Sequence, residues 1–375
     1  MPFFCVTIQE CRKTRAIEQS STRKIKNIRD KERIVIYRRL HIIGMFVLGW
    51  ALMSMAQDGT NAYNFLSVPV SSHVYAVGGH NITIIDDDIS LVEQNPALMG
   101  SEIDKQIGLN YMRYLGGSNF MGARYGQGIG EHGAFAVGIQ HYGYGSMMGY
   151  DINGVQTGQF SASDLAFNVT YSHDINDYLR GGITLKFLHS KYEIYSANAI
   201  AADLGINYYN PDHEVSASLV AKHLGGQIKQ FNDKKEKLPW DIQLGVSKTL
   251  TGLPLRLSLT AYGLTKWKSP YYTPQDKNNT NSQLVEKDSF GSNLLRHLVF
   301  GVEILPKDNI YLALGYNYRT RTDMSTYNRN FLSGFSVGAG LRVKAFGFGV
   351  AFAQPHTGAT TMMFNFNTTI SELMR

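Results

Sequence analysis

The side chains best suited to chemistry are three consecutive carboxylates, Asp86, Asp87 and Asp88. Carboxylate oxygens suit a hard cation, but calcium needs six or more converging oxygens, and nothing around the triplet resembles a complete calcium loop. We therefore expect a solvated turn here and no metal site. The ten histidines beyond residue 56 show no HExxH or other metal-binding spacing, and we expect them in turns or in a lumen. They are His73, His80, His132, His141, His173, His189, His213, His223, His297 and His356.

Two serine–histidine pairs and one glycine-rich stretch are the remaining candidates for catalysis or phosphate binding. His141 with Ser146, and His189 with Ser190, place a base near a hydroxyl, but the sequence identifies no third group to orient the base. The stretch 126–133 lacks the Lys-Ser/Thr pair and the following helix of a phosphate-binding loop, so we expect a turn. The sequence therefore predicts a protein that is not an enzyme and has no cofactor.

These candidates lie on segments in which apolar and polar side chains alternate with a period of two. One face of 183–187 carries Ile, Leu and Phe while the other carries Thr and Lys, and 255–261 alternates in the same way. Such alternation is typical of β-strands with one face in an apolar surrounding. The pattern predicts an all-β fold, a transmembrane antiparallel β-barrel of about 14 strands over 106–370. The expected strands are 107–115, 118–125, 133–143, 164–172, 179–192, 198–209, 214–223, 240–248, 254–262, 296–305, 309–318, 333–343, 346–354 and 359–367.

The connections between these strands also favour a barrel. A barrel with both termini in the periplasm has short inner turns and long outer loops. The long connections fall at alternate positions, namely 144–163, 224–239, 263–295 and 319–332. Three connections on the same side are short, near 116–117, 193–197 and 355–358, but no inner turn is long.

A secreted β-sandwich is the soluble alternative, because it also alternates apolar and polar residues. Glycine recurs on the polar face, and aromatic residues stand at strand ends, as in the girdles of membrane barrels. Together with the one-sided distribution of long connections, these features favour a barrel in the cell outer membrane with lipid as its surrounding.

The N-terminal region has the features of an export signal. Residues 38–56 combine a basic start, an apolar run and a small-x-small end, which predicts a signal peptide cleaved between Ala56 and Gln57. The apolar run is too short to span a bilayer as a helix. We expect 1–37 to be a disordered extension or a wrongly assigned gene start.

Charge and cysteine content narrow the function further. The formal net charge of +6 comes from residues 1–56, which hold eleven Lys and Arg, so 25 basic and 26 acidic residues remain beyond them. A mature chain with this balance lacks the basic surface that nucleic-acid binding needs. Cys5 and Cys11 both lie in the leader, which leaves the remainder without a disulfide or a thiolate site.

Residues 57–105 do not form a regular strand series. They contain Asn64-Phe65-Leu66 followed by Pro69, then Gly78-Gly79, the acidic triplet, and Asn95-Pro96-Ala97-Leu98. On physical grounds this is a short plug-like segment in or near the periplasmic mouth or lumen of the barrel.

In the order of these motifs, the chain resembles the PorQ family, whose members are barrels of the type IX secretion system of the Bacteroidota. More broadly, the chain is similar to the long-chain fatty-acid transporter-like superfamily, which includes PorV. The resemblance covers about 57–370, and Asn95, Pro96 and Ala97 alone are specific only to the superfamily. The long polar leader departs from the family pattern.

The resemblance implies a non-enzymatic anchor. A PorQ-type barrel holds the surface protein PorZ in an attachment complex with PorU and PorV, and in that complex PorU cleaves sorting signals and joins cargo to anionic lipopolysaccharide. We expect the long connection 263–295 to dock such a partner through Trp267, Tyr271 and Tyr272. The alternative is a transporter or channel for hydrophobic small molecules, with 60–105 as its gate.

Overall fold

The computed structural model describes residues 63–231, 235–268, 271–274, 284–307, 309–323, 332–356 and 359–373. All of the described residues belong to one compact unit, Thr60–Arg375. The expectations for 1–37 and for the signal peptide at 38–56, with its cleavage between Ala56 and Gln57, lie outside the described residues.

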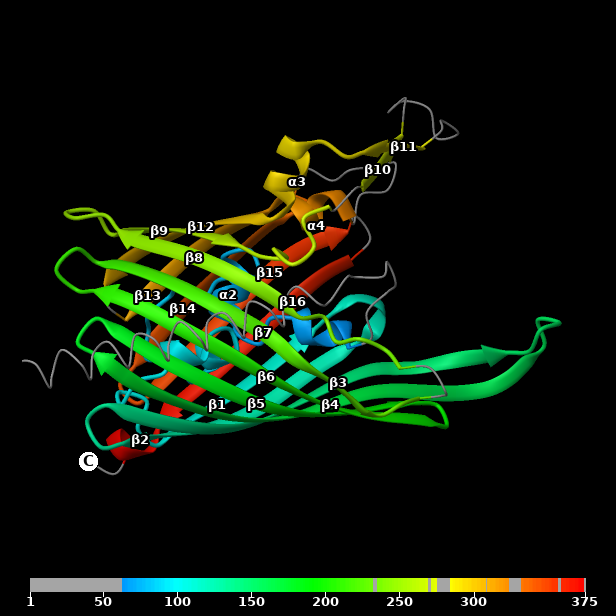
Figure 1. The fold of residues 1–375 in the computed structure, drawn as a ribbon, viewed down its shortest axis with the longest axis horizontal. Helices are drawn as coiled ribbons and strands as arrows, with labels where there is room; N and C mark the ends of the chain where they lie inside the picture. The colour runs from blue at the N-terminus through cyan, green and yellow to red at the C-terminus, as the bar shows by residue number, and fades with distance from the viewer. Residues whose placement is uncertain are drawn as a thin grey trace, which may run out of the picture. The chain divides into compact units, whose positions relative to one another are not determined.

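Within the described residues, fourteen antiparallel strands close into one barrel (Figure 1). Each strand pairs with its neighbours along the chain, and β1 pairs with β16 from Gln106↔Thr369 to Arg113↔Met362 to complete the ring. This confirms the predicted fold class, and each expected strand corresponds to one of the fourteen. The strands are β1 (Gln106–Arg113), β2 (Asn119–Ile129), β3 (Gly133–Tyr150), β4 (Gln156–Asn176), β5 (Leu179–Tyr192), β6 (Tyr195–Asn210), β7 (Val215–Lys229), β8 (Asp241–Thr249), β9 (Leu255–Ala261), β12 (Leu298–Lys307), β13 (Ile310–Asn317), β14 (Phe335–Val343), β15 (Phe346–His356) and β16 (Ala359–Thr369).

Side chains alternate between the inside and the outside of the ring. In β5, Leu185 is 57% exposed, whereas Thr184 and Lys186 are 1% and 3% exposed. A closed sheet satisfies its backbone without an edge, and its outward apolar belt is suited to lipid. Other outward apolar residues include Leu109, Val169, Leu219, Leu244, Leu312, Val337 and Phe348.

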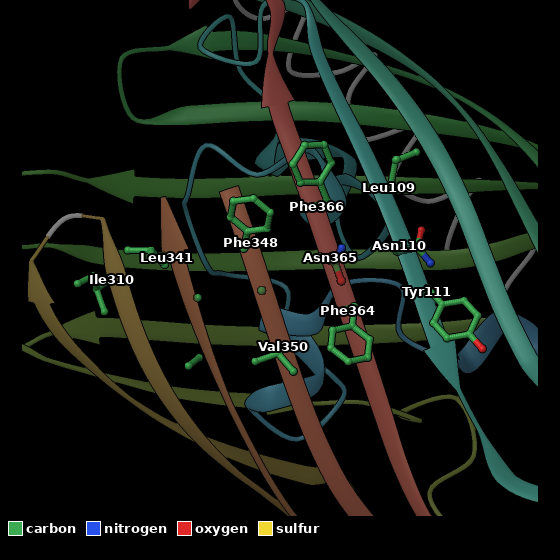
Figure 2. A pocket seen from close by; sticks show the side chains of 13 residues that line it. Leu109, Asn110, Tyr111, Ile310, Leu341, Phe348, Val350, Phe364, Asn365 and Phe366 are labelled. Atoms are coloured by element: carbon green, nitrogen blue, oxygen red, sulfur yellow. The ribbon is translucent and has the colours of Figure 1, made fainter. Parts of the chain in front are cut away.

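The outward face near the closure of the ring carries a shallow apolar groove of about 600 Å³ (Figure 2). Leu109 of β1, Phe348 of β15 and Phe364 of β16 line it. Asn110 and Asn365, next to these residues in the chain, are buried on the inward side. The groove is therefore part of the lipid-facing surface.

Several expected connections are shorter in the structure, among them 144–163 and 126–132. Most of 144–163 is strand, because β3 and β4 continue as a paired hairpin to a turn at 151–155. Its alternation is hidden in the sequence because both of its faces are largely exposed to solvent, so neither must be apolar. Likewise β2 runs through most of the glycine-rich stretch to Ile129, and the turn begins only at Gly130, which has a φ of 63°.

Other elements stand in the long connections. The hairpin β10 (Tyr271–Pro274) and β11 (Leu284–Lys287) is followed by α3 (Phe290–Arg296), and α4 (Tyr318–Asp323) follows β13. A last helix, α5 (Ile370–Leu373), follows β16. In the part of the chain that the structure describes, no helix has both the length and the apolar run that crossing a membrane requires.

Residues 63–105, called the lumenal segment below, lie inside the ring. They form η1 (Asn64–Ser67), α2 (Ser72–Ala76), η2 (Ile89–Glu93) and η3 (Pro96–Leu98). Short polar side chains cap three of these turns, since Ser71, Asp88 and Asn95 each accept a hydrogen bond from a following backbone N–H. The helix α2 packs on β13 to β16, η2 on β1 and β2, and η3 on β4 to β6.

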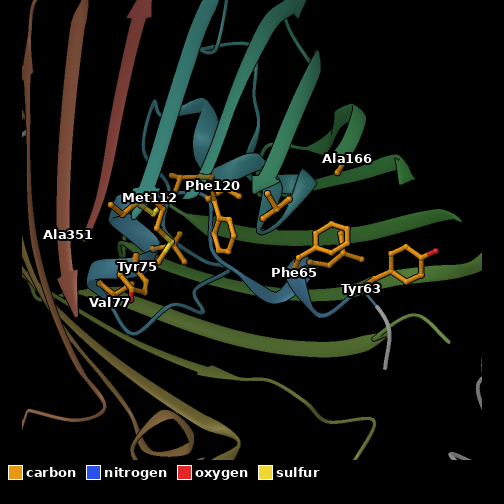
Figure 3. Packing of buried hydrophobic residues seen from close by; sticks show 14 of the residues in the cluster. Tyr63, Phe65, Tyr75, Val77, Met112, Phe120, Ala166 and Ala351 are labelled. Carbon is orange, nitrogen blue, oxygen red and sulfur yellow. The ribbon is translucent and has the colours of Figure 1, made fainter. Parts of the chain in front are cut away.

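A buried apolar cluster joins the lumenal segment to the wall (Figure 3). Phe65 packs on Tyr142 of β3 with ring centroids 4.8 Å apart, and Phe120 of β2 packs on the same ring at 5.0 Å. Tyr75 and Met112 belong to the same cluster. The core of this protein is therefore the interface between the lumenal segment and the inner wall.

Candidate functional site

The Asn95-Pro96-Ala97 motif forms a fixed turn against the inner wall. The Asn95 side chain accepts a hydrogen bond from Ala97 N (2.9 Å) and donates to Ile82 O (3.0 Å) and to Ser218 Oγ of β7 (3.1 Å). Pro96 occupies the first turn of η3, where a backbone N–H would have no acceptor within the helix, so its absence costs no hydrogen bond. The motif residues therefore seat the segment on the wall.

Glycines of the wall make room for this turn. A Cβ on Gly182 of β5 would lie 2.5 Å from the Pro96 carbonyl carbon, and one on Gly205 of β6 would overlap the Asn95 side-chain oxygen. Gly245 of β8 is similarly close to Ile82, at 2.8 Å. The small residues on the inner face thus allow the backbone of the lumenal segment to approach closely.

Glu93 anchors the same side of the segment. Lys186 Nζ of β5 lies 2.6 Å from Glu93 Oε1 and 2.8 Å from Asp203 Oδ2 of β6, while Asn168 donates to Glu93 Oε2 at 2.8 Å. Burial alone would raise the pKa of Glu93, but Lys186 and Arg124 outweigh it and hold that pKa below its ordinary value. Glu93 therefore faces the wall as a charged carboxylate.

His73 anchors the opposite side of the segment. Its Nε2 bonds Glu303 of β12, its Nδ1 lies 3.6 Å from Asp86, and its ring stacks on Tyr311 at 3.7 Å. Arg256 of β9 completes the cluster with bonds of 2.7 and 2.8 Å to Glu303. Burial by itself would lower the pKa of His73, but the Glu303 and Asp86 carboxylates raise it to about 9. The imidazole is therefore cationic at neutral pH.

The acidic triplet extends this second cluster toward solvent. Arg342 of β14 lies 3.4 Å from Asp86 and 2.9 Å from Asp87, and Asp88 caps η2. The expectation of a solvated turn fits Asp87, which is 56% exposed, but not Asp88, which is 8% exposed. A cavity of about 240 Å³ lies beside the triplet, and both Arg256 and Leu305 line it.

The candidate hydrolase pairs have other partners. Ser146 donates to Gln159 at 3.2 Å, and His189 contacts Asn198 at 2.7 Å. In both cases the neighbouring strand of the hairpin supplies the partner. Neither arrangement shows a base directed at a serine hydroxyl.

The expected docking residues lie beyond the wall, in the connection 263–295. Trp267 is 39% exposed and stacks on His297 at 5.0 Å, with Phe290 at 5.7 Å. Tyr271 and Tyr272 are described only by their backbone, in β10. Partner docking by this connection stays a prediction.

Sequence reasoning missed the charged clusters. In the sequence, Lys186 is only a polar residue on an alternating strand, and no pattern assigns a role to Glu93 or Glu303. Charged residues on the inward face of a barrel strand are the available signal, since in a filled lumen each of them needs a partner. The sequence does not show which carboxylate each cation meets.

Comparison with known proteins gives a likeness of fold. No protein-family model and no curated protein matches the chain. The toluene transporter TodX of Pseudomonas putida is 11% identical with a TM-score of 0.48, covering 78% of this chain and 95% of that one. A FadL homologue of Pseudomonas aeruginosa is 11% identical (TM-score 0.46; 80% and 97% covered). The outer membrane protein Omp33 of Acinetobacter baumannii is 9% identical (TM-score 0.34; 70% and 96% covered).

The location follows from the surface of the ring. A closed ring of fourteen antiparallel strands with an apolar outward belt is the form in which strands cross a bacterial outer membrane. The chain is an outer-membrane β-barrel.

Proposed function

We propose that the chain is a non-enzymatic outer-membrane component of the type IX secretion system that anchors a PorZ-like surface protein, in an attachment complex with PorU and PorV. The observation that carries the proposal is the occupied lumen. The chain's own segment 63–105 fills it and is held on opposite sides by the Glu93 and His73 clusters. A filled barrel of this kind is suited to act as a rigid anchor.

The energetics of the lumen support this role. The inner members of both clusters, Lys186 with Asp203 and His73 with Glu303, are buried, and each has an opposite charge nearby. Removing one partner from such a cluster leaves an uncompensated buried charge, which destabilises the fold by about 3–5 kcal/mol. Opening the lumen would separate the contacts of both clusters at once.

The resemblance to the PorQ family supplies the identity of the partner. Its motif Asn95-Pro96-Ala97 seats the lumenal segment on β5, β6 and β7. This role in filling the barrel suits a motif that the wider superfamily shares.

Transport of hydrophobic small molecules is the competing function. It requires the lumenal segment to move, since the cavity beside it measures about 240 Å³ and is lined by His73, Asp86, Arg256 and Arg342. These charged residues disfavour a hydrophobic solute, although Ile85, Leu305 and Leu341 of the same lining are apolar.

The test combines a gene deletion with a conductance measurement. We expect deletion to release the PorZ-like protein from the cell surface into the medium, and the barrel purified from its native membrane in detergent to carry that protein. In planar bilayers the purified barrel should conduct no ions. Retention of the surface protein in the deletion strain would refute the anchor, and conductance or uptake of a hydrophobic solute would favour the transporter.

A further inference from the structure

The hairpin made by the outer ends of β3 and β4 projects beyond the ring (Figure 1). Pairing between β2 and β3 ends at Asn119↔Gly143, and pairing between β4 and β5 ends at Ala162↔Tyr192. Residues 144–161, called the outer hairpin below, are therefore not part of the barrel wall. At about 3.3 Å per residue, the β3 arm of seven residues reaches about 23 Å.

Within the described residues, neither long edge of the outer hairpin pairs with a neighbouring strand. The connection before β2 is only the short turn η4 (Leu115–Gly117), and β5 and β6 are joined through Glu193 and Ile194. On the β4 side, Glu193 N donates to Ser161 O at 3.1 Å. Among the described residues, no strand pairs with 144–150 on the side away from β4. The short outer connections that the sequence shows near 116–117 and 193–197 are the reason that these edges are bare.

Apart from the bulges at its two register shifts, the outer hairpin carries few features that protect its edges. Natural edge strands are usually blocked by lysine, proline, inward charges or bulges. Between 144 and 161 there is neither Lys, Arg nor Pro, and Asp151 is the single charged residue. Its exposed side chains include the apolar Tyr150 at 63%, Ile152 at 101% and Val155 at 60%, beside polar ones such as Gln156 and Gln159.

The outer hairpin is nevertheless well fixed. Asp151 closes its turn by accepting hydrogen bonds from Asn153 N (2.9 Å) and Val155 N (2.8 Å). At its base, Tyr144 donates to the buried Asp164 at 2.6 Å. A preformed edge loses little conformational freedom when a partner binds, which favours binding.

The two edges differ in regularity. On β4, Gly158 has a φ of 130° and the register shifts between Gly149 and Tyr150 leave Thr157 without an opposite residue. On β3, the register shift between Gly143 and Ser146 lies at Gly145, which has a φ of 78°, and each residue of 146–150 beyond it has a partner on β4. The β3 edge at 146–150 is thus the better template, and its length is typical of a strand.

We propose that the surface partner of this barrel docks by β-augmentation, adding one of its own extended strands to the free edge of 146–150. Main-chain hydrogen bonds supply the affinity, and apolar side chains of the added strand cover Met148 and Tyr150. This proposal rests on the proposed anchor function and assigns the docking to the outer hairpin in place of the connection 263–295.

Hydrogen–deuterium exchange on the native complex tests the proposal. The sample is the barrel purified in detergent with the surface protein that co-purifies from its own outer membrane, compared with the barrel alone. We expect backbone amides in 146–150 to exchange about tenfold more slowly in the complex. Unchanged exchange in a persisting complex would overturn the docking site and leave the anchor function intact. Absence of any bound surface protein would refute both.

A truncated variant gives a second readout. Replacing 147–160 by Asn-Gly joins Ser146 to its cross-strand partner Ser161 and keeps every wall pairing. We expect about tenfold less surface protein retained on cells, while the barrel keeps its heat-dependent shift in gel migration. Full retention would contradict the proposal.

The matched control is Ile194→Ser, which removes an apolar side chain 81% exposed on the adjacent turn without altering a free edge. It should retain the surface protein as the wild type does.

Two other occupants of the free edge or of the docking role are distinguishable. Concentration-dependent protection of 146–150 in the barrel alone would assign the edge to a second copy, and loss of retention on deleting 271–287 with an unchanged hairpin would assign docking to the β10–β11 connection. Either result overturns the proposal.

Discussion

At the scale of single residues, buried charges decide how the lumenal segment is held. His73 and Glu93 belong to the segment, and Glu303 and Lys186 are their partners on the wall. Each contact lies in the interior, where an ion pair is screened little and an unpaired charge is costly. Substitutions at these positions therefore change the attachment of the segment more than the pairing of the wall.

Attachment of the segment should depend on pH through His73. Docking raises the pKa of His73 from 6.5 to about 9, because Glu303 and Asp86 outweigh burial and the nearby Arg256. The protonated form favours docking, so its contribution is complete below pH 6.5 and is lost as the pH rises through about 9. Amide exchange in 63–105, measured from pH 6 to 10 and corrected for intrinsic rates, should show growing exposure. The variant His73→Gln should lack this dependence, and equal profiles in the two proteins would contradict it.

Lys186→Met should loosen the segment on its other side. The change leaves Glu93 and Asp203 buried without their shared cation, at a cost of about 3–5 kcal/mol. Urea denaturation of the refolded barrel in lipid vesicles and protease cleavage within 63–105 should both register the loss. The exposed Lys191→Met is the matched control and should resemble the wild type. Equal behaviour of the two variants would show that the buried pair is not stabilising.

At the scale of elements, η3 and α2 dock on strands whose inward residues are small. Gly182 and Gly205 face η3, while Gly315 and Gly338 face the end of α2. The wall strands therefore fit closely against η3 and α2 because the wall has no side chains at these glycines. A side chain added at Gly182 or Gly315 would have to displace backbone atoms of the segment, which cannot rotate away as a side-chain end can.

Gly182→Val should expel the motif turn. Its Cβ would lie 2.5 Å from the Pro96 carbonyl carbon, and overpacking of this kind costs about 1–3 kcal/mol. We expect faster amide exchange at 95–98 in a barrel that still closes. Gly226→Val in β7 is the control, because a Cβ added at Gly226 would meet no heavy atom within 4 Å. A normal exchange rate at 95–98 in Gly182→Val would show that the glycine is dispensable.

At the scale of the whole molecule, lipid is the surrounding that makes the outward face stable. The belt carries Leu, Ile, Val and Phe over all the wall strands, whereas the outer hairpin carries exposed apolar residues in water. These two exposed apolar surfaces therefore differ in their surroundings and should respond differently to charge.

Leu185→Arg should destabilise the barrel and Ile152→Arg should not. Leu185 is central in β5 and faces lipid, where an arginine near the midplane costs about 2–4 kcal/mol. Ile152 is fully exposed at the tip of the outer hairpin, where the same change should be close to neutral. Urea unfolding in vesicles compares the two variants. Equal losses would argue against lipid as the surrounding of Leu185.

The sequence alone determined the wall. Alternation in stretches such as 183–187 and 255–261 is a local consequence of having lipid on one side of a strand, so it can be read without knowledge of the fold. It predicted fourteen strands and their order, and the closed ring confirms them. Where both faces are in water, as in 144–163, alternation disappears and the strand was missed.

Only the tertiary structure decided the contents of the lumen. Glu93 meets Lys186 across 93 positions of the chain, and His73 meets Glu303 across 230. Such contacts depend on how a segment without periodicity docks inside a finished ring, and local side-chain patterns do not encode that docking. For the same reason, the small inward glycines were recognised in the sequence, but the backbone that requires them became visible only in three dimensions.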